Sequence, residues 1–172
     1  MKNKSGFTLI ELMIVIAVIA LLAAAVFVAV DPVKRIGQAQ DSQRWQDVTA
    51  IADAIKLYMA DNNGNFPVDI ITVEPHLSYE IMILGSTSLT GSSCAPDLLY
   101  GDPEIEPANG VLLSNLVPNY LPTMPVDPSG LNLGFNDEYG TGYYLNRNSS
   151  GKITIGACDK SDYTSEPIRA QR

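Results

Sequence analysis

Residues 7–30 form a nearly unbroken apolar stretch. Nineteen apolar residues run from Leu12 to Val30, and Phe7 to Ile10 precede them with Thr8 as the one polar member. At 1.5 Å per residue, the nineteen residues predict a helix of about 28 Å, close to the hydrocarbon thickness of a bilayer. A single carboxylate, Glu11, interrupts the stretch, and a charge at the centre of a bilayer costs about 2.5–3.5 kcal/mol. We therefore expect Glu11 to have a partner.

A segment of mixed polar and apolar residues follows directly. Asp31 is a good N-cap and Pro32 suits the first position of a helix, but inside a continuous helix Pro32 would remove a hydrogen bond. Gly37 is a second weak point, so we expect a helix break near 30–37.

From Arg35 to Asn62 apolar residues recur at steps of three and four, which predicts an amphipathic helix. The stripe expected to face a core is formed by Trp45, Val48, Ile51, Ala52, Ile55 and Met59. The charged residues expected on other faces are Arg44, Asp47, Asp53, Lys56 and Asp61. The run Asn62–Asn63–Gly64 predicts the end of this helix.

The composition changes after residue 63. Of the 24 Gly and Pro residues, 21 lie at or beyond Gly64, which predicts a loop-rich head with short elements. Short strands are expected at 70–73 and 79–84, the latter being equally consistent with a helical turn, and a short helix at 112–117. The clearest pattern is a β-hairpin, with strands at 142–146 and 152–158 and a turn at 148–151.

Composition excludes several classes of function. The chain has 172 residues and a net charge of −8, a poor match for nucleic acid or anionic lipid, so we expect no direct nucleic-acid binding. One histidine and two cysteines do not form a zinc-ligand pattern, and no catalytic or phosphate-binding motif is present, so we predict a non-enzyme without a required cofactor. If the head is exported, Cys94 and Cys158 are expected to form a disulfide; two free buried thiols are the alternative.

Three interpretations of the N-terminus compete. Lys2 and Lys4 before the apolar run favour a cytoplasmic N-terminus, with the body of the protein across the membrane. The run could be a secretory signal cleaved near Ala23–Ala25, but it is longer than usual and contains Glu11. A plain signal anchor leaves Glu11 unexplained.

The third interpretation rests on the residues Lys4-Ser5-Gly6-Phe7-Thr8-Leu9-Ile10-Glu11. This segment resembles the class III signal of type IV pilins and type II secretion pseudopilins, in which a short basic leader ends in Gly before Phe-Thr-Leu-Ile-Glu and an apolar helix. The resemblance implies cleavage between Gly6 and Phe7 by a prepilin peptidase and N-methylation of Phe7. It also suggests that Glu11 pairs with the Phe7 amine of a neighbouring subunit, which would set the register of a polymer.

Two further segments carry the resemblance. Residues 61–67, ending in Asn65-Phe66-Pro67, look like the Asn-Gly-x-Tyr-Pro end of the long helix of many pseudopilins. Residues 120–128 resemble the Tyr-Leu-Pro-x-x-Pro-x-Asp-Pro segment of major pseudopilins and related pilins. Because major pseudopilins bind calcium in the loop that follows, Asp127 and Asp137 are candidate ligands; Asn and Asp are equally common in ordinary turns.

Together these patterns predict an α+β protein with a long N-terminal helix and a small head that carries a short antiparallel sheet. The expected parts are a leader at 1–6, an apolar membrane or filament-core helix at 7–30, an amphipathic helix at 31–63 and a head at 64–172. The resemblance implies a single-pass membrane precursor that becomes a helical homopolymer on the cell surface.

The partners implied are a prepilin peptidase and methyltransferase, a platform protein and an assembly ATPase. The predicted function is that of a structural pilin. A major pseudopilin of a secretion system and a membrane-anchored binding module that never polymerises are the alternatives.

Overall fold

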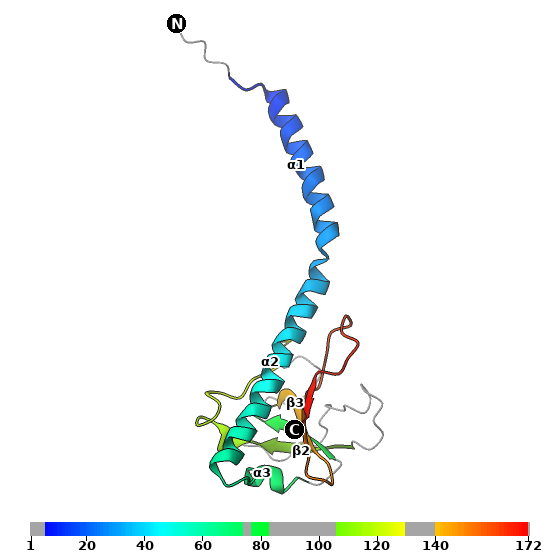
Figure 1. Ribbon diagram of the computed structural model, residues 1–172. Coiled ribbons are helices and arrows are strands. Elements are labelled where there is room, and N and C mark those ends of the chain that lie inside the picture. The colour runs from blue at the N-terminus through cyan, green and yellow to red at the C-terminus, as the bar shows by residue number, and fades with distance from the viewer. Residues whose placement is uncertain (1–5, 74–76, 83–105, 130–139, 172) are drawn as a thin grey trace. The chain divides into compact units, whose positions relative to one another are not determined.

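A computed structural model of the chain describes residues 6–73, 77–82, 106–129 and 140–171 (Figure 1). The chain divides into two compact units, Met1–Gly37 and Gln38–Arg172. The first unit contains the apolar helix, and the second contains a five-stranded sheet with a helix packed on it. The predicted α+β class is confirmed.

Helix α1, Leu9–Val30, forms where the apolar run is found, and none of its residues is buried. The helical stretch that begins at Leu9 is long and apolar enough to cross a membrane. Asp31 ends α1 in the left-handed region, with φ 45°, and its carboxylate accepts a hydrogen bond from the Lys34 N–H at 3.3 Å. This break and cap are the ones expected at Asp31–Pro32. Helix α2, Pro32–Asp61, continues through Gly37 without a break, since one glycine costs a helix only about 1 kcal/mol.

The end of α2 agrees with the prediction from Asn62–Gly64. Asn63 and Gly64 take positive φ values of 57° and 82°, which reverse the chain after the last turn. The Gly64 N–H donates to the Met59 carbonyl at 2.7 Å and so satisfies one of the last carbonyl groups of the helix.

The sheet has the strand order β2-β1-β3-β4-β5. Its strands are β1 Leu77–Met82, β2 Glu106–Leu112, β3 Gly140–Arg147, β4 Ile153–Ala157 and β5 Arg169–Gln171. Neighbouring strands are antiparallel except for β1 and β2, which are parallel. The predicted hairpin is the β3–β4 pair, and Asn148 closes its turn by accepting from the Ser150 and Lys152 N–H groups at 3.1 and 2.8 Å.

In the head, one local prediction is wrong and another is confirmed only in part. The β-branched residues at 70–73 predict a strand, but the short helix α3, Val68–Ile71, begins there after Pro67. In the segment 112–117, Leu112 ends β2 and only Ser114–Leu116 forms a turn of 3₁₀-helix, η1. Ile70 and Leu116 are fully buried in the core. In segments this short, such packing outweighs the intrinsic secondary-structure propensity of the residues.

The core lies between one face of α2 and the sheet. Val48, Ile51 and Ile55 of α2 are buried together with Leu145 and Ile155 from the central strands. Most of the predicted apolar stripe therefore faces the core. Trp45 is an exception, because 41% of its surface is exposed.

The charged residues of α2 depart further from the prediction. Arg44, expected on a solvent face, is only 2% exposed, and Asp47 is 8% exposed. Arg44 Nε and one terminal nitrogen donate to the two oxygens of Asp127 at 2.6 and 3.0 Å, and the other terminal nitrogen donates to Asp41 at 2.8 Å. Asp47 accepts from the Tyr143 hydroxyl at 2.6 Å. Each of these buried charges thus has a polar partner.

Asp41 also holds the segment after β4. It accepts from the Ser161 N–H at 2.9 Å and from the Ser161 and Thr164 hydroxyls. Burial by itself would raise the pKa of the Asp41 carboxyl, but these hydrogen bonds and the one from Arg44 hold the pKa below its usual value. Burial would likewise lower the pKa of Arg44, whereas Asp127 and Asp41 raise it and keep the guanidinium charged.

Replacing Arg44 by methionine should lower the free energy of unfolding by about 3–5 kcal/mol, because two buried carboxylates lose their cation. The matched control is Lys56→Met on the same helix. Lys56 pairs with Asp53 at 3.0 Å, but both side chains are about half exposed, so its loss should cost at most about 1 kcal/mol. Urea unfolding of the full chain in detergent measures both values, and equal losses would contradict the assigned role of Arg44.

The free energy of unfolding should also fall in acid, because the Asp41 carboxylate becomes protonated. A carboxyl whose pKa is lowered by folding stabilises the fold above its unfolded pKa, about 3.9, and this contribution is lost as the pH falls through the folded pKa. Asp41→Asn should therefore be less stable than the parent at pH 7 and lose less of its remaining stability below about pH 4. A stability profile of Asp41→Asn that runs parallel to that of the parent in acid would refute the assignment.

Candidate assembly site

The predicted cleavage site precedes α1 and is accessible. Gly6 is exposed, and Phe7 has 90% of its surface exposed. Neither residue belongs to the helix, which begins at Leu9. An exposed peptide bond that precedes the helix is one that a peptidase can bind without unfolding the helix.

Glu11 has a local partner that the sequence reasoning missed. Its Oε2 accepts from the Thr8 N–H at 2.9 Å and from the Thr8 hydroxyl at 2.8 Å, while the Glu11 N–H donates to Thr8 Oγ1 at 3.3 Å. Thr8 is the N-cap of α1 and Glu11 is its third residue, so the pair forms a capping box. The signal is present in the sequence, since Thr-x-x-Glu before an apolar run is the typical pattern of this motif.

The capping box fixes where the carboxylate lies. Two donors from Thr8, the residue after Phe7, hold Glu11 Oε2 against the start of the helix. A carboxylate has two oxygens with about four acceptor positions in all, so it can accept from Thr8 and still bind a cation. The box therefore orients the charge and does not neutralise it.

The rest of α1 presents apolar side chains in all directions. Leu, Ile, Val, Met and Phe side chains from Leu9 to Val30 are exposed, with fractions from 48% at Val18 to 81% at Val28. A surface of this size is unstable in water and requires lipid or another protein to cover it.

The other predicted site residues are not part of this arrangement. Pro32 opens α2 and Gly37 lies within it. Cys158 is buried, whereas Cys94 lies outside the described residues, so the disulfide stays a prediction.

Both oxygens of Asp127 accept from Arg44, and Asp137 lies outside the described residues, so calcium binding also stays a prediction. Among the described residues, no three His, Cys, Asp or Glu side chains are grouped as metal ligands.

The chain resembles known proteins over part of its length. Residues 1–27 match the prokaryotic N-terminal methylation motif. The chain is also similar to the type II secretion system core protein G of Pseudomonas aeruginosa, with 41% identity over 61 residues, which is 36% of this chain and 42% of that protein. The similarity thus spans less than half of the relative's length. No solved structure matches the chain.

The methylation motif covers the same residues in which the exposed Gly6–Phe7 bond and the Glu11 cap are found. The relative is, by its name, a core protein of a type II secretion system. Both findings support the resemblance of this chain to type IV pilins and type II secretion pseudopilins.

Proposed function

We propose that the chain is the structural subunit of a type IV pilus-like filament, assembled by packing of its N-terminal helices. The observation that carries the proposal is α1 itself, 22 residues long with no buried residue. An apolar helix that is exposed on every side can be covered by lipid before assembly and by copies of itself afterwards.

The charge at the start of α1 favours assembly. Cleavage after Gly6 would leave a free amine at Phe7, and methylation would keep its positive charge. The Glu11 carboxylate, oriented by Thr8, is a suitable partner for the amine of an adjacent subunit. Two charges that are costly to hold separately in an apolar environment become one pair, which forms only at the correct axial position.

A major pseudopilin of a type II secretion system is the second candidate. The name of the Pseudomonas aeruginosa relative favours it, and so does the resemblance of residues 120–128 to that class. The two candidates share the mode of assembly and differ in what the filament does. A membrane-anchored binding module with the same signal, which never polymerises, is the competing class.

The proposal implies the partners and locations of this mode of assembly. The precursor would be a single-pass protein of the inner or cytoplasmic membrane, processed by a prepilin peptidase that also methylates Phe7. A platform protein and an assembly ATPase would drive extraction of α1 from the bilayer. The assembled filament would lie outside the cell.

Shearing cells that produce the chain should release filaments in which the subunit begins with N-methyl-phenylalanine at Phe7. Electron microscopy of the sheared fraction and mass spectrometry of the N-terminal peptide provide the two measurements. A chain that is cleaved and methylated but stays entirely in the membrane fraction would favour the anchored module. Comparing exported proteins in cells with and without the chain then separates a pseudopilus from a surface pilus.

Glu11→Gln should leave membrane insertion unchanged and reduce filament yield at least about tenfold, the effect of losing about 1.4 kcal/mol. Glutamine at this position can still complete a capping box, so the substitution removes the charge and keeps the cap. Thr8→Ala is the complementary control, because it removes the cap and keeps the charge. If Thr8→Ala abolishes filaments while Glu11→Gln does not, Glu11 acts as a cap and the intersubunit pair is wrong.

A further inference from the structure

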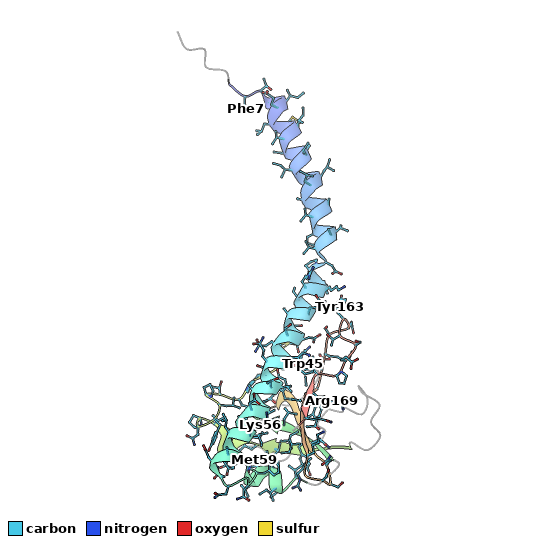
Figure 2. All side chains as sticks on the ribbon, viewed as in Figure 1. Phe7, Trp45, Lys56, Met59, Tyr163 and Arg169 are labelled. Atoms are coloured by element: carbon cyan, nitrogen blue, oxygen red, sulfur yellow. The ribbon has the colours of Figure 1, made fainter. Side chains whose placement is uncertain are left out.

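One flank of α2 carries two large apolar side chains, Trp45 and Met59, that the fold of a single copy leaves only partly covered. Trp45, Ala52, Lys56 and Met59 follow one another at intervals of seven, four and three residues, so they lie along one side of the helix. Figure 2 shows Trp45, Lys56 and Met59 in this order along α2. These four residues, with Phe66, Ile155, Ala170 and Tyr163 of the same unit, are called the Trp45 flank.

A pocket of about 310 Å³ lies at the C-terminal end of the Trp45 flank. Ala52, Lys56 and Met59 line it from α2, and Phe66, Ile155 and Ala170 are among the residues that complete it. Its volume is roughly twice that of a 150 Å³ cavity that holds benzene, which leaves room for one or two large apolar side chains. Met59, Phe66 and Ala170 are only partly buried, so the pocket opens to the surface.

A second exposed aromatic residue lies near the other end. Asp41 is one turn before Trp45 on α2 and binds Ser161 and Thr164, so the segment that contains Tyr163 is held against this part of the helix (Figure 2). Trp45 and Tyr163 are 41% and 45% exposed. Tryptophan, tyrosine and methionine are the residues enriched at protein interfaces, and Trp and Tyr dominate their hot spots.

We propose that a neighbouring copy of this chain packs on the Trp45 flank in the filament; the inference rests on the function proposed above. Chain continuity supports a second copy as the occupant. Only Asp31 separates α2 from α1, so copies that associate through α1 bring further copies of the same chain to α2.

The geometry of a filament restricts which part of the neighbour makes the contact. A surface that pairs with itself produces a closed two-fold dimer, whereas an open helical polymer needs two different surfaces on each subunit. The neighbour therefore covers the Trp45 flank with residues that lie outside it.

Trp45 is the only tryptophan in the chain, so the intrinsic tryptophan fluorescence of the full-length protein reports this surface alone. In sheared filaments the emission of Trp45 should shift to shorter wavelength, and acrylamide should quench it several-fold less than in the same sample dissolved to monomers in detergent. Trp45→Ser should reduce filament yield several-fold with unchanged membrane abundance and protease resistance. Trp45→Phe should restore the yield, which distinguishes a lost contact from a misfolded head.

A photo-crosslinking amino acid at position 45 should join two copies of the chain, with the second attachment point outside the Trp45 flank. Filaments in which Trp45 keeps the emission and quenching of the monomer would overturn the inference and leave the filament function intact. Crosslinks from position 45 to position 45, or to a different protein, would also overturn it. If the wild-type chain forms no filaments at all, the proposed function fails, and this inference with it.

Discussion

The guanidinium of Arg44 joins three segments that lie far apart in the sequence. Its hydrogen bonds connect α2 to Asp127 in the proline-rich segment, and its partner Asp41 connects the same turn of α2 to the segment after β4. The apolar core fills the space between the following turns of α2 and the sheet. A buried ion pair has directional requirements that apolar packing lacks, so it fixes how the proline-rich segment runs across the helix.

Helix α2 was predictable from the sequence, whereas its buried polar contacts were not. Periodicity identified α2 from Arg35 onward, and the cap and stop signals at Asp31–Pro32 and Asn62–Gly64 indicated its two ends, because these features depend on local chemistry. The same periodicity placed Arg44 outside and Trp45 inside, and both positions are reversed. Charge normally indicates exposure, but Arg44 finds Asp127 83 positions away, and no local pattern contains that pairing. The short head elements failed for a related reason, since tertiary burial of residues such as Ile70 decided their conformation.

The candidate site was more accessible to sequence reasoning than the head. Gly6, Phe7 and Glu11 belong to one contiguous motif, and the match of residues 1–27 to the methylation motif agrees with the resemblance seen in the sequence. What the motif does not reveal is that Glu11 already has a role inside its own subunit. Sequence reasoning finds a membrane span with one anomalous charge, whereas the hydrogen bonds to Thr8 show that the charge also begins the helix.

The Thr8–Glu11 box has a consequence for maturation. Its three hydrogen bonds join Thr8 to Glu11, and both residues follow the predicted cleavage site. A cut after Gly6 therefore leaves the first turn of α1 with these hydrogen bonds, and the helix has no reason to fray when the preceding residues leave. Processing would then change the electrical state of the subunit without changing the conformation of its helix. Cleavage would add one positive charge, that of the Phe7 amine. The carboxylate of Glu11, the proposed partner of this amine in a neighbouring subunit, is already oriented by Thr8 before the cut.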